Sequence, residues 1–192
     1  MFNIAVLISG GGTNLQALID ANKEDKWQIK LVVSDKQNAF GLKRAVSANI
    51  KTLFISKYEP VKLLDSLKEN DIDGIVLAGY LSILPHEIIK VYEGKIINIH
   101  PSLIPAFCGK GFYGAKVHSA VLESGVKVTG ATAHFVDTGI DTGPIILQKT
   151  VPVLDGDTVD SLQKRVLQTE HEILVEAVRI LIGADYETKS ID

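Results

Sequence analysis

The chain has 192 residues, of which 46% are hydrophobic and 22% are charged, and its formal net charge is −3. This composition is that of a folded domain and excludes an intrinsically disordered chain, and the slight negative charge gives no general attraction to nucleic acid. We predict a single domain over residues 1–192, because domains of about 100–200 residues are usual.

Short apolar runs rich in β-branched residues alternate with amphipathic stretches in the first half of the chain. Near-continuous apolar runs such as Ile4–Ile8 and Ile75–Ala78 are typical of strands buried on both faces of a parallel sheet. The predicted strands are Phe2–Ile8, Gln28–Ser34, Thr52–Ile55, Gly74–Ala78 and Lys95–His100. The predicted helices are Asn14–Asn22, Gly41–Ala48, Pro60–Asn70 and Pro85–Glu93. This alternation predicts an α/β fold with a doubly wound, mostly parallel sheet.

The second half of the chain changes character. A loop rich in Gly and Pro, Pro101–Gly114, precedes a predicted helix at Ala115–Ser124. Two long strands follow, Val126–Val136 and Pro144–Leu154, and we expect them to pair with each other as an antiparallel pair. The longest helical pattern is Thr158–Ile182, with Asp157 or Thr158 as its N-cap, and the polar end Glu187–Asp192 is expected to fray.

The segment Ser9–Asn14 reads Ser-Gly-Gly-Gly-Thr-Asn and lies between the first predicted strand and helix. Glycines let the backbone approach a phosphate, the helix N-terminus offers free N–H groups, and Thr13 and Asn14 add side-chain donors. The segment is not a P-loop, and Leu15 occupies the third glycine position of a dinucleotide fingerprint, although Asp35 keeps that alternative open. A tight turn that merely requires glycine is the other alternative.

Asn98 and His100 lie at the carboxyl end of a predicted buried strand, just before Pro101. Being two residues apart, their side chains share one face of the strand, at the edge where open α/β sheets bind ligands. An imidazole beside an amide donor suits a reaction that develops an oxyanion and moves a proton. The alternative is a histidine with a local hydrogen bond at a strand end.

The segment His134–Pro144 is a glycine-rich connection between two predicted strands, and it carries two acids, Asp137 and Asp141. Either carboxylate could pair with His100 and raise its pKa, because a nearby negative charge favours the imidazolium. Aspartates in such loops are equally often turn formers, so both interpretations stay open.

Four segments, in this order along the chain, are characteristic of one enzyme family: Ser9–Gln16, Leu77–Tyr80, Asn98–Leu103 and Asp141–Ile145. Over about residues 3–183 the chain resembles the folate-dependent phosphoribosylglycinamide formyltransferases. The resemblance implies a sheet of formyltransferase type with a C-terminal antiparallel strand pair and a long C-terminal helix. It implies an enzyme of de novo purine biosynthesis that transfers the formyl group of 10-formyltetrahydrofolate, its co-substrate, to the amine of 5-phosphoribosylglycinamide. The amine attacks directly through a tetrahedral intermediate, and no metal is required.

The resemblance also implies residue roles. The catalytic residues are Asn98, His100 and Asp141. The ribonucleotide is bound by Gly12, Thr13, Asn14 and Glu170. The folate is bound by Leu81, Ser82, Ile83, Leu84, Asn98, Val136, Asp137, Thr138, Gly139 and Ile140. Two positions depart from the pattern: many relatives have Arg in place of Ser82, which bears on how the folate tail is held, and some have a polar or cationic residue near the phosphate in place of Leu167.

The mechanistic hypothesis gives Asn98 and protonated His100 the task of donating hydrogen bonds to the developing oxyanion. Asp141 is expected to keep His100 charged and to help relay the amine proton to N10 of the folate through water.

Several alternatives compete with this interpretation. Cys108, the one cysteine, has no recognisable base beside it, and the histidines, including His118 on a predicted helix surface, lack metal-site spacing. A deformylase or a methionyl-tRNA formyltransferase is expected to carry a further domain, and a nucleotide-binding sensor leaves Asn98, His100 and Asp141 without a function.

The N-terminus shows no signal pattern and no run is long enough to span a bilayer. We therefore expect a cytoplasmic protein that acts on small molecules without membrane or nucleic-acid partners.

Overall fold

The computed structural model describes residues 1–22, 27–57 and 59–189, with the backbone alone for 184–189. Its centre is a seven-stranded sheet in the order β3-β2-β1-β4-β5-β6-β7. The strands are β1 (Phe2–Ile8), β2 (Trp27–Ser34), β3 (Lys51–Phe54), β4 (Gly74–Leu77), β5 (Ile96–His100), β6 (Val128–Phe135) and β7 (Ile145–Pro152). The helices are α1 (Thr13–Ala21), α2 (Phe40–Ser47), α3 (Pro60–Glu69), α4 (His86–Val91), α5 (Ala115–Ser124) and α6 (Val159–Lys189).

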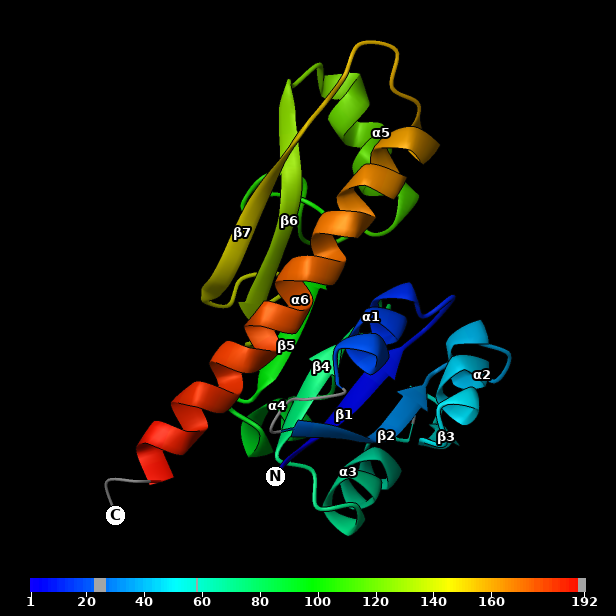
Figure 1. Ribbon diagram of the computed structural model, residues 1–192, viewed down its shortest axis with the longest axis vertical. Helices are drawn as coiled ribbons and strands as arrows, with labels where there is room; N and C mark the ends of the chain where they lie inside the picture. The colour runs from blue at the N-terminus through cyan, green and yellow to red at the C-terminus, as the bar shows by residue number, and fades with distance from the viewer. Residues whose placement is uncertain (23–26, 58, 190–192) are drawn as a thin grey trace.

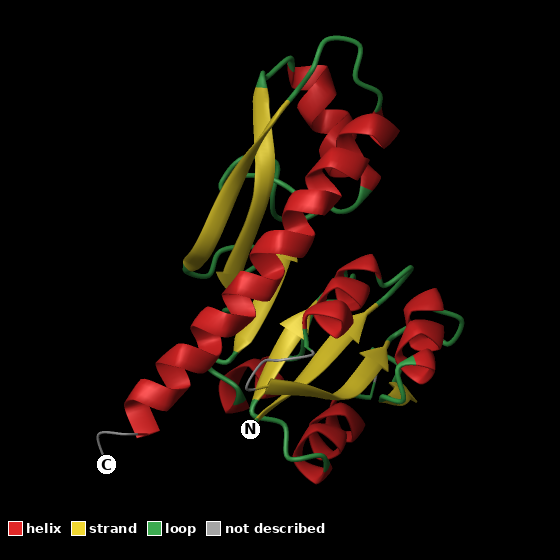
Figure 2. Cartoon of the chain, viewed as in Figure 1, coloured by secondary structure: helices red, strands yellow, loops and turns green. Residues whose placement is uncertain are grey.

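In the sheet, each strand from β3 through β2, β1 and β4 to β5 pairs in parallel with the next. The pairs β5–β6 and β6–β7 are antiparallel. Figure 2 shows the long β6 and β7 strands at one end of the molecule, away from the N-terminal strands. The predicted doubly wound sheet with a C-terminal antiparallel pair is therefore confirmed. Because β1 lies between β2 and β4, the chain crosses over in opposite directions from β1, and the carboxyl ends of strands at such a point are where open α/β sheets usually bind ligands.

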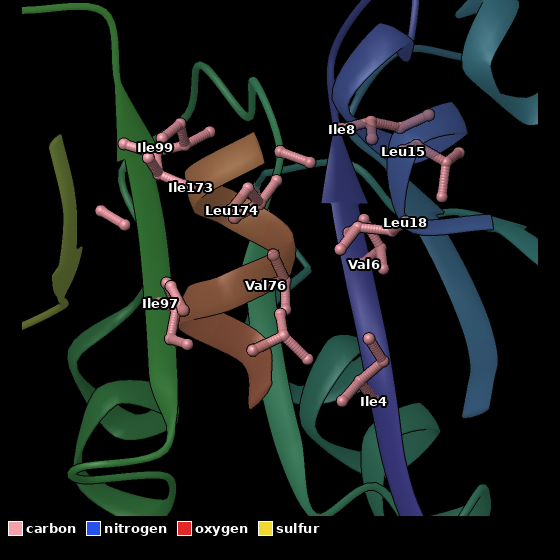
Figure 3. Close-up of a cluster of buried hydrophobic side chains, with 14 of the residues drawn as sticks. Ile4, Val6, Ile8, Leu15, Leu18, Val76, Ile97, Ile99, Ile173 and Leu174 are labelled. Carbon is pink, nitrogen blue, oxygen red and sulfur yellow. The ribbon is translucent and has the colours of Figure 1, made fainter. Parts of the chain in front are cut away.

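Alternate residues of β1 enter two separate hydrophobic clusters. Ile4, Val6 and Ile8 face the cluster that contains side chains of α1, α5 and α6, and Ala5 and Leu7 face the cluster of α3 and α4. This is the period-two alternation of a strand that is buried on both faces, so its near-continuous apolar run is explained. Figure 3 shows Ile4, Val6 and Ile8 pointing toward the α1 side of the sheet.

The helix α6 runs along one face of the sheet and lies beside α5 at its N-terminal end and beside α1 further along (Figure 1). The backbone N–H of Ser161 donates to Thr158 Oγ1 over 3.2 Å, which confirms Thr158 as the N-cap. Asp157 instead accepts two hydrogen bonds from the Arg165 guanidinium, at 2.8 and 2.7 Å. These bonds fix the turn that leads into the helix.

The predicted elements are confirmed in type and order, and most ends differ by one or two residues. The predicted end of α6 is wrong, because the helix continues to Lys189 and not to Ile182. The expected fraying of Glu187–Asp192 is therefore wrong as far as residue 189, and residues 190–192 lie outside the described residues. Each residue added to an existing helix forms one further backbone hydrogen bond, and an apolar pattern does not report where this extension ends.

Leu174 is fully buried between α6 and the sheet, where Figure 3 shows it among side chains of β1, β4 and β5. Leu174→Ala should lower the free energy of unfolding by about 2–5 kcal/mol, because it removes buried methyl groups and leaves a cavity. Urea denaturation measures this loss. Ile180, on the same helix, is 40% exposed, and Ile180→Ala should cost less than about 1 kcal/mol. Equal losses for both variants would contradict the packing of α6.

Candidate active site

A cleft with a volume of about 420 Å³ opens beyond the carboxyl ends of β4 and β5, within the range of about 300–1,000 Å³ that small-molecule sites usually have. Its walls are the loop after β4, the end of β5, the glycine-rich loop before α5, the connection between β6 and β7, and one face of α6. All the residues predicted to contact the folate line this cleft, as do the three predicted catalytic residues and Glu170. Gly12, Thr13 and Asn14 do not form part of its wall.

Asn98, on β5, lies between His134 and Asp141. Its amide Nδ2 is 3.0 Å from His134 Nε2 and 3.4 Å from Asp141 Oδ1. The other ring nitrogen of His134 lies 2.8 Å from the Phe135 carbonyl oxygen, which can only accept, so Nδ1 carries the proton. In the neutral ring Nε2 then accepts, and this requires Asn98 to present its NH₂ group. The network therefore fixes the orientation of the Asn98 amide.

His100 is 4% exposed, and both of its ring nitrogens face acceptors. Nε2 donates to the Phe107 carbonyl over 2.9 Å, and Nδ1 lies 3.6 Å from Asp141 Oδ2. Burial lowers the pKa of His100 below its usual value, although the Phe107 carbonyl and the Asp141 carboxylate act to raise it. The prediction that Asp141 pairs with His100 is confirmed. Desolvation therefore outweighs the carboxylate in the free protein, and the expectation that Asp141 keeps His100 charged during the reaction stays a prediction.

Asp141 lines the cleft and contacts both Asn98 and His100. Its Oδ2 accepts the backbone N–H of Gly109 at 2.9 Å, which ties the β6–β7 connection to the glycine-rich loop. Burial acts to raise the pKa of Asp141, but the neighbouring His134 ring, the Gly109 N–H and the His100 ring outweigh it and hold this pKa below its usual value. The carboxyl group is therefore ionised at neutral pH.

Asp137, the other candidate partner of His100, has a different task. Its Oδ1 accepts the Thr142 hydroxyl at 2.6 Å and the Gly139 backbone N–H at 2.9 Å. The carboxylate thus closes its own loop, as the turn-forming alternative describes, and holds the backbone that lines one end of the cleft.

The glycine-rich loop after β1 is clamped against α2. Gly12 adopts a φ of 70°, and a Cβ at this position would lie 2.6 Å from the Cα of Gly41. The Gly41 N–H donates to the Gly10 carbonyl at 3.0 Å, and Arg44 Nε donates to the Gly11 carbonyl at 2.8 Å. Glycine at position 12 is required both by its left-handed conformation and by this close approach.

Asn14 and Glu170 form a buried pair that joins this loop to α6. The Asn14 Nδ2 donates to Glu170 Oε2 over 2.8 Å, and both residues are less than a tenth exposed. Glu170 therefore takes one of the two N–H donors of the Asn14 amide, and the role of Asn14 in phosphate binding stays a prediction. Burial raises the pKa of Glu170, with the Asn14 amide opposing the shift. Through this pair the loop reaches the cleft wall, to which Glu170 contributes directly.

Comparison with known proteins agrees with this arrangement. The model of the formyl transferase family matches residues 2–178. The chain is 42% identical to a chloroplastic phosphoribosylglycinamide formyltransferase of Vigna unguiculata, over 93% of this chain and 60% of that protein. It is 41% identical to the solved glycinamide ribonucleotide transformylase 1 of Symbiobacterium toebii, with a TM-score of 0.89 over 95% of this chain and 89% of that one.

The chain belongs to the formyl transferase family. It spans about three-fifths of the length of the plant relative and 18% of the human trifunctional purine biosynthetic protein adenosine-3, to which it is 43% identical. The family fold predicted from the sequence is thus confirmed.

Ser82, at one of the two positions that depart from the family pattern, forms a hydrogen bond within the protein. Its hydroxyl donates to Asp35 Oδ2 at 2.5 Å, and the Leu81 N–H donates to Ser9 Oγ at 2.8 Å. These bonds hold the Leu81–Leu84 segment against the ends of β1 and β2. Asp35 therefore supports the predicted folate wall, and the dinucleotide alternative is not needed to explain it.

Cys108 lacks the surroundings of a nucleophile. Its thiol lies 3.3 Å from the Pro105 carbonyl, and burial followed by the charge of Asp141 raises its pKa. A raised pKa disfavours the reactive thiolate. In the described ranges, no three side chains of His, Cys, Asp and Glu are placed to share a metal ion.

Two histidines that contribute to the cleft were not among the predicted site residues. His134 enters the site only because β6 pairs with β5, which sets it opposite Asn98. His118 was predicted on a helix surface, and this is wrong: it is 1% exposed and lines the cleft. Its place next to Val117 and near Val121 on α5 was the available signal, since both valines are core residues.

The buried His118 makes the protein sensitive to acid. Burial, with a further effect of His100, lowers its pKa from the usual 6.5 to about 4. As the pH falls from 6.5 toward 4, the unfolded chain takes up a proton that the folded chain does not, so the free energy of unfolding falls, by up to on the order of 3 kcal/mol. Denaturant titrations at a series of pH values should show a smaller fall in His118→Phe than in the wild type. Parallel curves would contradict a neutral buried His118.

Proposed function

We propose that the protein transfers the formyl group of 10-formyltetrahydrofolate to the amine of 5-phosphoribosylglycinamide. The observation that carries the proposal is the Asn98, His100 and Asp141 cluster in a cleft whose walls are the predicted folate segments and Glu170. The names of the similar proteins support the same reaction, which is the known reaction of this family. The cleft fits the co-substrate in chemistry, since apolar walls beside backbone amides suit a flat ring with a polar edge.

Asn98 is proposed to stabilise the negative charge that develops on the formyl oxygen when the amine attacks. One of its N–H donors is used by His134 at 3.0 Å, and the other makes only a long contact of 3.4 Å to Asp141. The long contact is the weaker one and is the one that a substrate oxygen can replace. A donor already oriented by its neighbour needs little reorganisation during the reaction.

His100 and Asp141 are proposed to handle the proton that the amine loses. In the free protein the Nε2–H of His100 is engaged by Phe107, so the site that exchanges a proton is Nδ1, facing Asp141. With its pKa lowered by burial, His100 is ready to accept a proton rather than to serve as a permanent cation. This modifies the hypothesis from the sequence, in which His100 also donates to the oxyanion.

The two substrates are proposed to enter from opposite ends of the cleft. The folate end is formed by Leu81–Leu84 and Val136–Ile140, and the ribonucleotide end by Glu170 and the glycine-rich loop Gly10–Asn14 behind it. Because Glu170 takes one N–H of Asn14, the donors proposed for the phosphate are the second Asn14 N–H, Thr13 and backbone N–H groups. Holding both substrates in one cleft supplies orientation.

Within the described residues, no helix is long and apolar enough to cross a membrane. The cytoplasmic location and the lack of nucleic-acid partners stay predictions, and the plant relatives are named as chloroplastic. The single domain over 1–192 also stays a prediction.

The proposed reaction is tested by following loss of the formyl group from 10-formyltetrahydrofolate by absorbance, with and without 5-phosphoribosylglycinamide. Loss that depends on the ribonucleotide is the expected result. Loss without the ribonucleotide would identify a deformylase, in which water replaces the amine. No loss in either case would contradict catalysis and favour a module that only binds nucleotides.

Asn98→Ala should lower kcat by about 100–1,000-fold, the usual cost of removing an oxyanion donor, with a much smaller change in the KM of either substrate. Steady-state kinetics at saturating concentrations of both substrates measures this. The matched control is Asn70→Ala, because Asn70 at the end of α3 bonds to Lys51 and to the Ser66 carbonyl, outside the cleft. Near-normal turnover of Asn98→Ala would rule out the assigned role.

A further inference from the structure

The imidazole of His118 is buried in the wall of the cleft without a complete set of partners. His118 is 1% exposed, and its Nδ1 is buried with no hydrogen-bond partner within the part of the chain that the structure describes. Leaving a buried polar group unpaired carries a desolvation cost, so such groups are rare in folded proteins. An apolar side chain at this position avoids that cost, because the neighbouring Val117 and Val121 are fully buried core residues.

The position of His118 in the cleft indicates which substrate it faces. Helix α5 packs with α6 in one hydrophobic cluster, which contains Val117, Val121 and Val166. In Figure 1 α5 lies beside the N-terminal part of α6. The same helix α6 presents Gln163, Leu167 and Glu170 to the cleft, spaced as one helical face. The predicted folate residues Leu84 and Val136 belong instead to the cluster on the opposite face of the sheet. His118 therefore lies on the ribonucleotide side.

The charge state of His118 limits the kind of group that it can bind. Burial lowers the pKa of this ring to about 4, so the ring is neutral at physiological pH. A neutral imidazole has one N–H donor and one acceptor nitrogen, which matches a hydroxyl or an amide. A phosphate would favour the imidazolium, and the glycine-rich loop already offers backbone donors to it.

We propose that His118 is a substrate-binding residue whose ring hydrogen-bonds to an uncharged polar group of the phosphoribosyl substrate, a ribose hydroxyl or the glycinamide amide. The proposal rests on the proposed function. Under this proposal, the part of the cleft wall near His100 also binds the ribonucleotide and holds its reacting amine. The hydrogen bond to the substrate is proposed for the part of the ring that lines the cleft.

The test compares His118→Phe, which keeps an aromatic ring of similar size without nitrogen, with His118→Gln, which keeps a donor and an acceptor. In His118→Phe the KM of the ribonucleotide should rise by about 10-fold, the usual effect of losing one buried hydrogen bond. The KM of the folate should stay within about 2-fold, and the melting temperature of the free protein should rise by about 2–4 °C, because the unpaired polar group is gone. His118→Gln should recover part of the ribonucleotide affinity.

A histidine with a purely structural role would give the reverse pattern, with a lowered melting temperature and an unchanged KM of the ribonucleotide, and this would overturn the proposal. A KM change confined to the folate would also overturn it. If His118→Phe fails to fold, an unchanged ribonucleotide KM in His118→Leu, which also lacks a ring nitrogen, would overturn the proposal in the same way. A wild-type protein without ribonucleotide-dependent transfer would overturn the proposed function itself, and this inference with it.

Discussion

The carboxylate of Asp141 joins the parts of the site that come from different regions of the chain. Its two oxygens contact Asn98 and His100 on β5, His134 on β6 and the Gly109 N–H in the loop before α5. A buried negative charge is costly unless donors surround it, and the Asn98 amide and the Gly109 N–H both donate to this carboxylate. Because the same carboxylate holds two loops and orients two side chains, the geometry of the cleft depends on it.

Burial has the largest effect on the pKa of the two histidines His100 and His118, and it lowers the pKa of both. For His100 the burial effect is larger than the opposing effect of the Asp141 carboxylate. A neutral imidazole can accept a proton, whereas an imidazolium cannot, so the proposed role of His100 in proton transfer agrees with the direction of this shift. The same burial is expected to lower the stability of the protein in mild acid.

Much of the candidate site was accessible from the sequence because strand and loop positions carry the signal. Asn98 and His100 share one face of β5 by period-two alternation, and the folate residues that the family resemblance implied do line the cleft. The long-range partners of the site residues were not predicted. The Asn14 amide bonds to Glu170, 156 residues away, and His134 meets Asn98 only through the pairing of β5 with β6. Local pattern does not contain such long-range partners.

The sequence by itself determined the order and type of the elements, because two-faced apolar runs and amphipathic periodicity are local properties. It also determined the glycine positions at the turns, where backbone conformation excludes other residues. The local pattern left both Asp137 and Asp141 as possible partners of His100, and only the tertiary structure, in which Asp141 reaches His100 while Asp137 closes its own loop, confirms the choice that the family resemblance implied. The tertiary structure alone decided the direction of the pKa shift of His100 and the burial of His118, because desolvation depends on everything packed around a group and not on its neighbours in the chain.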